Sequence, residues 1–334
     1  MTADCATFAA MLVLTLALVG CAPHAALAPP VGEPALAYEV RTTEPFPKRL
    51  PRTPADLVIL YGGENHGSLE TCGCPHRPRG SLARFVGYAT AAQRAAPAPT
   101  LRVNTGYWLT DAVDYAGQPR LDAEVMDIWA MRGMAAAGFD ALNVTAHDVA
   151  GLVRVPPDPS LPLVSANVSG PGIARYVILE RGGRTIGITG ITGPGATMAD
   201  ISAYPIAPAE RATAVLAELV SRVDVVVLMG WQANGALRSL QKAVPGIDVI
   251  LDSGLYADAL PPVFQLGAAW AFSEYQMVRA GELRLRLDGG RVLGGVDRHV
   301  DLDAAVPDDP VIAAIARDAR LDLDRVQKEL YGGG

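Results

Sequence analysis

The sequence predicts a layered α/β fold, and the alternation of strand-like and helical segments is the main observation behind this prediction. Short runs rich in Val, Ile and Leu alternate with helical stretches from residue 57 to residue 251. Such alternation is typical of sheets whose faces are covered by helices. Two further observations favour a single domain. The chain after Pro54 is long enough to build one full core, and it contains no linker-like stretch.

The predicted elements follow one another in a regular order. Strands are expected at 57–61, 101–104, 141–145, 161–166, 225–229 and 247–251, and helices from about residue 81, over 121–138, over 208–222 and briefly between the last two strands. Gly182-Gly183 indicates a hairpin turn. From Val263 onward the runs resemble antiparallel strands, including 282–287 and 292–300 around Asp288-Gly289-Gly290, and a terminal helix is expected after Pro310.

The N-terminal segment predicts export. Residues 8–19 form an apolar run that ends in Leu18-Val19-Gly20-Cys21. This run is shorter than the roughly 20 residues that span a bilayer, so it is typical of a signal peptide. Small residues directly before a cysteine resemble the bacterial lipobox, in which the cysteine is acylated and becomes the new N-terminus. We expect residues 1–20 to be a lipoprotein signal peptide and residues 21–54, rich in Ala and Pro, to be an extended tether.

Charge and cysteine usage limit the partners. The formal net charge is −7, and lysine occurs only at Lys48, Lys242 and Lys328. The arginines are scattered, so no basic stripe is available to follow a phosphate backbone. We therefore expect no nucleic acid among the partners. The expected partners are the membrane, through lipidated Cys21, and envelope redox proteins, with the protein facing the periplasm or placed at the outer membrane.

Three short motifs follow the first predicted strand in close succession. They are Glu64-Asn65-His66-Gly67, Glu70-Thr71-Cys72-Gly73-Cys74-Pro75 and Gly80-Ser81-Leu82-Ala83-Arg84. Loops at the carboxyl ends of strands are where an α/β sheet places its chemistry. The order of the motifs resembles the 5'-nucleotidase branch of the calcineurin-like metallophosphoesterases. That branch begins with Asp-x-His-Gly, often has an acidic Cys-Gly-Cys segment, and continues with Gly-Gly-Leu-Ala-Arg.

The resemblance extends over most of the body and implies its fold. It continues through 143–148, 163–168, 186–191, 224–229 and 245–252. The implied architecture is a metallophosphoesterase-like αββα sandwich, with two facing mixed sheets flanked by helices, over residues 55–334. Active members of the family hold two metal ions bridged by a carboxylate, which activate a water and clamp the phosphoryl oxygens.

The family's metal ligands are carried over incompletely. Glu64 falls on the first aspartate, and His66 and His147 fall on retained histidines. Tyr107 falls on the bridging aspartate, and a neutral phenol does not replace a bridging carboxylate. Ala146 falls on the ligating asparagine. The resemblance therefore leaves Glu64, His66 and His147 as remnants of the family site, and the catalytic residues of this chain are unknown.

Later positions depart from the family as well. Gly230 stands near a ligating histidine, and Ser253-Gly254-Leu255-Tyr256 stands where the family has Gly-His-x-His. We also expect no nucleoside-gripping domain after Val300. These departures favour a pseudoenzyme that serves as a binding, scaffold or thiol- or metal-linked redox component. The alternative is an active metal-dependent phosphoesterase with a reduced metal site.

The Cys-Gly-Cys segment offers a different chemistry. In an extended loop, Cys72, Cys74 and His76 would turn their side chains to one side, close to His66. Thiolate and imidazole ligands suit one zinc or copper ion, and His147 would complete the set if it folds over as the family geometry implies. Two alternatives stay open. The cysteines form a strained local disulfide, or they bridge nothing and pack.

Polar and aromatic side chains after the strands are candidates for a remodelled pocket. Trp231, Gln232 and Asn234 follow a strand where the family has catalytic polar groups, and Tyr107 and Tyr256 fall on lost ligand positions. Clustered aromatic rings beside a lost site are typical of a binding cleft. We favour the alternative, in which the rings fill the volume that metals and water have left.

Overall fold

The computed structural model describes residues 38–44, 54–114, 116–193, 201–254, 263–265 and 267–332. The compact unit that carries these residues spans Leu36–Gly334. Cys21 and the predicted signal peptide lie outside the described residues, so the lipoprotein assignment stays a prediction.

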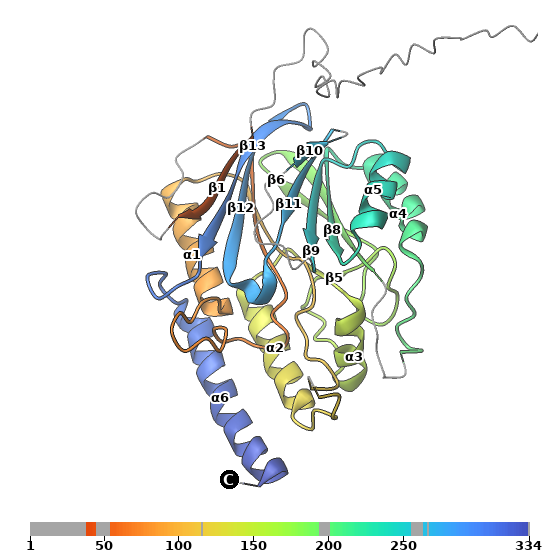
Figure 1. Cartoon of the computed structure of the whole chain (residues 1–334). Helices are drawn as coiled ribbons and strands as arrows, with labels where there is room; N and C mark the ends of the chain where they lie inside the picture. The colour runs from red at the N-terminus through yellow and green to blue at the C-terminus, as the bar shows by residue number, and fades with distance from the viewer. Residues whose placement is uncertain are drawn as a thin grey trace, which may run out of the picture. The chain divides into compact units, whose positions relative to one another are not determined.

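One sheet has seven strands of mixed direction (Figure 1). Its order is β1 (Tyr38–Glu44), β13 (Arg291–Asp301), β12 (Arg279–Asp288), β2 (Leu57–Gly62), β3 (Thr100–Asn104), β4 (Ala141–Asn143) and β5 (Leu163–Val164). The strands from β2 to β5 are parallel, whereas β12 runs antiparallel to both β2 and β13.

The other sheet has six strands. Its order is β10 (Val263–Gln265), β11 (Ala268–Phe272), β9 (Val249–Ser253), β8 (Val225–Trp231), β7 (Arg184–Thr192) and β6 (Val177–Arg181). The central strands from β11 to β7 are parallel, and the edge strands β10 and β6 are antiparallel to their neighbours.

The two sheets face each other across a shared apolar layer. Leu57, Ile59 and Tyr61 of β2 alternate into this layer, where they meet Val225 and Val227 of β8. The intervening residues of each strand point to the opposite face, because side chains alternate along a strand.

Helices cover both outer faces. The outer face of the first sheet packs against α1 (Leu82–Ala95), α2 (Ala123–Ala137), α3 (Ala146–Arg154) and α6 (Pro310–Tyr331), and that of the second against α4 (Ala212–Val220) and α5 (Asn234–Ala243) (Figure 1). Short 3-10 turns occur at Ala209–Arg211 and Tyr275–Met277. The predicted αββα architecture is therefore confirmed.

Three elements differ from the sequence prediction. Tyr38–Glu44, inside the segment expected to be a tether, forms β1 and pairs in parallel with β13; the alternating Tyr, Val and Thr of this stretch favour a strand. The strand β11 runs parallel to β9, although we expected antiparallel strands from Val263 onward. The strand expected at 161–166 is reduced to Leu163–Val164.

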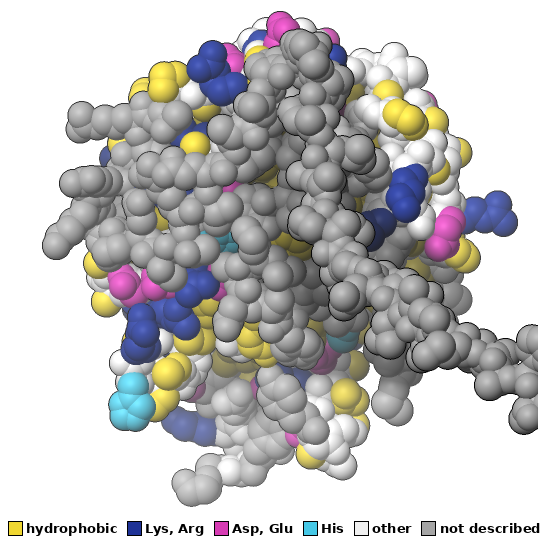
Figure 2. All heavy atoms as spheres, turned by 45° about the horizontal axis from the view of Figure 1, so that its top comes forward, with side chains coloured by type: hydrophobic (Ala, Val, Ile, Leu, Met, Phe, Trp, Pro, Cys, Tyr) yellow, Lys and Arg dark blue, Asp and Glu magenta, His cyan; other side chains and the backbone are white. Residues whose placement is uncertain are grey.

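The charged surface is mixed. On the face shown in Figure 2, Lys and Arg side chains occur in small separate groups among Asp and Glu. Among the described helices, none is both long and apolar enough to cross a bilayer.

Candidate functional site

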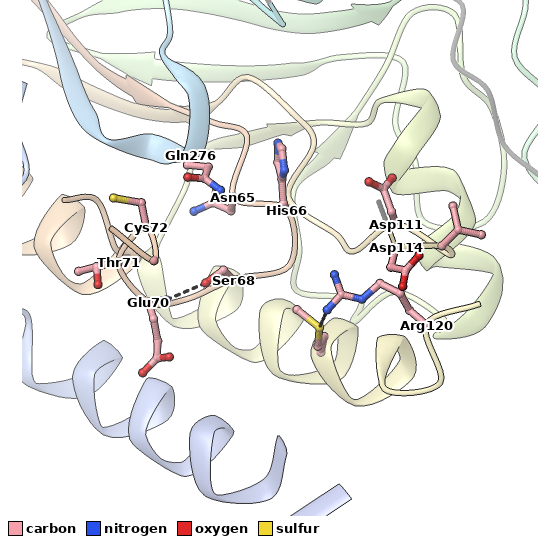
Figure 3. Close-up of a pocket in the computed structure, with 13 residues that line it drawn as sticks. Asn65, His66, Ser68, Glu70, Thr71, Cys72, Asp111, Asp114, Arg120 and Gln276 are labelled. Atoms are coloured by element: carbon pink, nitrogen blue, oxygen red, sulfur yellow. Dashed lines mark hydrogen bonds between the residues drawn. The ribbon is translucent and has the colours of Figure 1, made fainter. Parts of the chain in front are cut away.

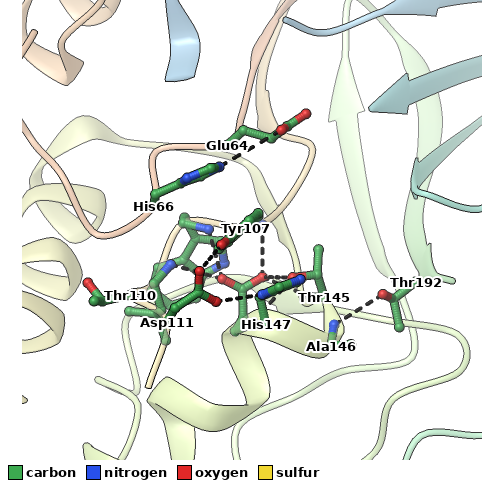
Figure 4. Close-up of polar contacts among 12 residues, drawn as sticks. Glu64, His66, Tyr107, Thr110, Asp111, Thr145, Ala146, His147 and Thr192 are labelled. Atoms are coloured by element: carbon green, nitrogen blue, oxygen red, sulfur yellow. Dashed lines mark hydrogen bonds and ion pairs between the residues drawn. The ribbon is translucent and has the colours of Figure 1, made fainter. Parts of the chain in front are cut away.

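The candidate site lies at the carboxyl ends of neighbouring strands. Glu64 and His66 follow β2, Tyr107 follows β3, and His147 lies in the first turn of α3 after β4 (Figure 4). Trp231 is the last residue of β8 in the facing sheet. Parallel strands bring their carboxyl ends to one edge of a sheet, which explains how residues distant in sequence meet.

Three rings form a stack at the centre of this site. The ring of Tyr107 lies 3.8 Å from that of His66 and 4.1 Å from that of His147, with interplanar angles of 20° and 21°. Trp231 meets Tyr107 and His147 edge-on, at 5.6 and 4.8 Å between centroids. Tyr275 meets His66 edge-on at 4.9 Å. The phenol ring therefore fills the space between His66 and His147, the two histidines that the sequence analysis gives as remnants of the family site.

The backbone that presents Tyr107 is held in an uncommon conformation by Asp148. Gly106 and Tyr107 have φ angles of 116° and 57°. A non-glycine residue at positive φ is strained and needs support from its surroundings. The buried carboxylate of Asp148 supplies it by accepting the N–H groups of Tyr107, Trp108 and Leu109 at 2.7 to 2.9 Å. The same carboxylate accepts the N–H and the hydroxyl of Thr145, at 2.8 and 2.6 Å, and so caps α3.

A second carboxylate joins two members of the stack. Asp111 accepts the phenol O–H of Tyr107, and its Oδ1 lies 2.6 Å from Nδ1 of His147 (Figure 4). Burial by itself raises the pKa of Asp111, but the hydrogen bonds from His147 and Tyr107 outweigh it and hold this pKa below its ordinary value. Burial and the neighbouring Asp111 raise the pKa of Tyr107, so the phenol keeps its proton.

The remaining predicted site residues are spread around the stack. Glu64 accepts the N–H of Gly254 at 2.7 Å, and its other oxygen lies 3.9 Å from Nε2 of His66. Asn234 donates to the buried Asp252 at 3.0 Å, whereas Gln232 is exposed. Tyr256 lies outside the described residues.

A cavity of about 300 Å³ opens beside the stack (Figure 3). Most of the side chains that line it are polar. They include His66, Glu70, Cys72, Asp111, Arg120 and Gln276. The cavity therefore connects the edge of the ring stack with the Cys-Gly-Cys segment, and its lining suits a polar group of a few atoms.

The Cys-Gly-Cys segment is bent. Cys72 and Cys74 are both free, and the N–H of Cys74 donates to the carbonyl of Cys72 at 2.8 Å. The extended loop that would turn Cys72, Cys74 and His76 to one side is therefore not formed. Cys72 is half-buried, and Cys74 and His76 are exposed. The backbone N–H groups of Arg77 and His76 donate hydrogen bonds to the sulfur of Cys74. These bonds lower the pKa of its thiol.

The five predicted metal ligands are not gathered at one point. In the part of the chain that the structure describes, no group of three or more His, Cys, Asp or Glu side chains is placed to hold a metal ion. His66 and His147 lie on the two sides of the Tyr107 ring, away from the exposed Cys74 and His76. A zinc or copper ion at this segment stays a prediction.

Several solved structures have a fold similar to that of this chain. A 5'-nucleotidase precursor of Thermus thermophilus aligns with a TM-score of 0.60 at 18% identity, over 83% of this chain and 60% of that one. The sulfate thiohydrolase SoxB of Thermus thermophilus aligns with a TM-score of 0.65 at 13% identity, over 82% of this chain and 62% of that one. A calcineurin-like phosphoesterase of Bacillus subtilis aligns with a TM-score of 0.61 at 17% identity, over 82% of this chain and 99% of that one.

The chain has the calcineurin-like phosphoesterase fold. It spans about three fifths of the length of the first two of these proteins. At the level of sequence, no protein-family model and no curated protein matches it.

The residues present do not fit the dinuclear metal centre that active phosphoesterases hold. A metal ion in such a centre needs several ligand side chains that converge on it, and the described residues hold no cluster of three or more His, Cys, Asp or Glu side chains placed in that way. Here a complete phenol ring separates the two imidazoles. The carboxylate nearest to His147 is Asp111, which is already engaged by Tyr107. The chain has the phosphoesterase fold, and His66, Tyr107 and His147 pack ring against ring at the ends of its strands.

Sequence reasoning missed several contributors to the site, and three of them illustrate why. Asp111 joins the stack, Arg120 lines the cavity, and Tyr275 covers His66. None belongs to a motif of the phosphoesterase fold. Asp111 follows Tyr107 by four residues, and that spacing was the signal available for it.

Proposed function

We propose that this protein is a cell-envelope lipoprotein in which a phosphoesterase fold serves for binding or as a scaffold and not for hydrolysis. The observation that carries the proposal is the position of Tyr107 between His66 and His147. Phosphoester hydrolysis by this fold depends on two metal ions that clamp the transferred group, so filling their space removes the largest catalytic contribution.

The surrounding bonds support a permanent arrangement. The phenol is tied to Asp111, and the backbone at Tyr107 is tied to Asp148. A metal ion entering between the histidines would have to displace a buried ring and break the bond from its phenol to Asp111. The adjoining cavity, lined by His66, Arg120 and Cys72, stays open to a ligand. Binding at this cavity is the activity that we propose for the site.

Hydrolysis of a chromogenic phosphodiester, bis(4-nitrophenyl) phosphate, tests the proposal. The full chain is assayed with Mn²⁺, Zn²⁺ and Mg²⁺ beside the variants His66→Ala, His147→Ala and His76→Ala. His76 is exposed and lies outside the stack, so its variant is the matched control. We expect all four proteins to match the metal-only blank. Turnover that disappears in His66→Ala and His147→Ala but persists in His76→Ala would contradict the proposal and favour a hydrolase with a reduced metal site.

A further inference from the structure

The two cysteines of the Cys-Gly-Cys segment are positioned to form a reversible disulfide. Two residues apart in an extended chain, their Cα atoms would be about 7 Å apart, at the outer limit of the roughly 4.4 to 6.8 Å that a disulfide spans. The bond from the Cys74 N–H to the Cys72 carbonyl closes a three-residue turn. That turn makes the separation of the two Cα atoms shorter than it would be in an extended chain.

Hydrogen bonds fix the Cys72 end of this turn, whereas the Cys74 end is exposed to solvent. Thr71 and Gly80 form an isolated bridge, and the N–H of Cys72 donates to the carbonyl of Arg79 at 2.8 Å. The guanidinium of Arg79 is held by Asp301 at 3.0 Å. Cys72 therefore stays in place at the wall of the cavity, whereas Cys74 is presented to solvent.

The short spacing of the two cysteines favours the reduced pair. The N–H of Arg79 donates to Sγ of Cys72 at 3.3 Å. This contact helps to hold the Cys72 sulfur at the wall of the cavity. A disulfide between residues two apart in the chain closes a small, strained ring, so the oxidised pair is readily reduced. Such a pair exchanges electrons and does not lock a structure.

We propose that Cys72 and Cys74 are a redox-active dithiol that exchanges disulfides with a partner protein. The thiolate of Cys74 attacks one sulfur of the partner's disulfide, which forms a mixed disulfide and releases the partner's first thiolate. Cys72 then attacks the Cys74 sulfur, which releases the partner's second thiolate and leaves a Cys72–Cys74 disulfide. Two electrons and two protons pass to the partner, and the reverse sequence oxidises a partner dithiol.

The exposed cysteine is the attacking group, because a protein disulfide reaches only a sulfur at the surface. The half-buried cysteine resolves the mixed disulfide from the cavity side. This inference rests on the proposed function in one respect, since the pair meets protein disulfides only if the chain is exported.

The test uses the full chain with Cys5→Ser and Cys21→Ser, so that the pair holds the only thiols. The protein is equilibrated in mixtures of reduced and oxidised glutathione, quenched with acid, alkylated and weighed by mass spectrometry. We expect two alkylation sites to be lost together, without an accumulating glutathione adduct. Cys72→Ser should accumulate the adduct at Cys74, and Cys74→Ser should form one roughly tenfold more slowly, since Cys72 is recessed.

Two further arms sharpen the test. Gly73→Ala is the matched control, because a Cβ at Gly73 would meet no atom within 4 Å, and it should behave like the parent. Insulin, as a protein disulfide, should be reduced by the parent and roughly tenfold more slowly by Cys74→Ser. Independent alkylation of the two thiols at every glutathione ratio would overturn the inference. So would one equivalent of zinc or copper that shields both thiols. Either result leaves the phosphodiester assay unaffected, and phosphodiester turnover would in turn leave the thiol result unaffected.

Discussion

Replacing Asp148 by Asn should destabilise the protein strongly. One carboxylate oxygen accepts the N–H groups of Trp108 and Leu109, and the other accepts from Tyr107 and Thr145. An amide side chain keeps only one acceptor oxygen, so at least two buried N–H groups lose their partner in either orientation.

The magnitude follows from these lost bonds. Each buried N–H left without an acceptor costs about 1 to 3 kcal/mol, so two cost about 2 to 6 kcal/mol. Burial works in the other direction, because it penalises the carboxylate and raises the pKa of Asp148 above its ordinary value. Removing the charge returns part of that penalty. We therefore expect a loss of about 3 kcal/mol in the free energy of unfolding.

Urea unfolding at pH 7, followed by tryptophan fluorescence, measures the effect. A loss of this size lowers the midpoint by about 1 M or more. Asp309→Asn is the matched control. Asp309 caps α6 through a single oxygen, which accepts from Val311 and Ile312 at 3.0 and 3.1 Å. Asparagine caps a helix about as well as aspartate, so this variant should stay within about 0.5 kcal/mol of the parent. An Asp148→Asn variant equally close to the parent would refute the reasoning.

Three further outcomes are expected. Burial by itself lowers the pKa of His299, but Asp297 and Glu274 outweigh it and raise this pKa to about 9. The folded state thus holds this proton more tightly, so its stabilisation is complete below about pH 6.5 and is lost as the pH rises through 9. The free energy of unfolding of the parent, measured with urea, should fall by roughly 3 kcal/mol over that pH range. A His299→Gln variant whose free energy of unfolding fell equally with pH would contradict this. Tyr107→Ala should cost about 3 to 5 kcal/mol by leaving a void, and Tyr107→Phe only about 1 kcal/mol; equal midpoints for the two would exclude a packing role for the ring. Cys21→Ser should move the protein from the membrane to the soluble fraction after cell fractionation, and unchanged membrane association would rule out the lipid anchor.

Much of the fold was predictable because the residues that end its helices and turn its hairpins can be recognised from short stretches of sequence. Gly138 adopts a left-handed conformation and ends α2 where the sequence placed the end of that helix. Gly182-Gly183 and Gly289-Gly290 turn the two predicted hairpins. The strand β1 was missed because Tyr38–Glu44 is surrounded by residues typical of a tether, and its pairing partner β13 lies at the far end of the sequence.

The site was predictable only in part. The sequence indicated that Tyr107 replaces a bridging carboxylate, but not that its ring enters the gap between His66 and His147. That placement depends on the positive φ of Tyr107 and on two carboxylates, Asp111 and Asp148, that hold it. Asp111 lies four residues after Tyr107, but Asp148 lies in α3, far along the sequence, and its contact with Tyr107 leaves no local pattern.

Metal binding at the stack tests the central claim most directly. Calorimetric titration of Mn²⁺ into the full chain is compared with the same titration of a His66→Ala/His147→Ala double variant. If Tyr107 occupies the space between the histidines, both proteins should give the same heats, with no stoichiometric site. Binding of two Mn²⁺ per chain by the parent, lost in the double variant, would contradict the account and restore a phosphoesterase centre.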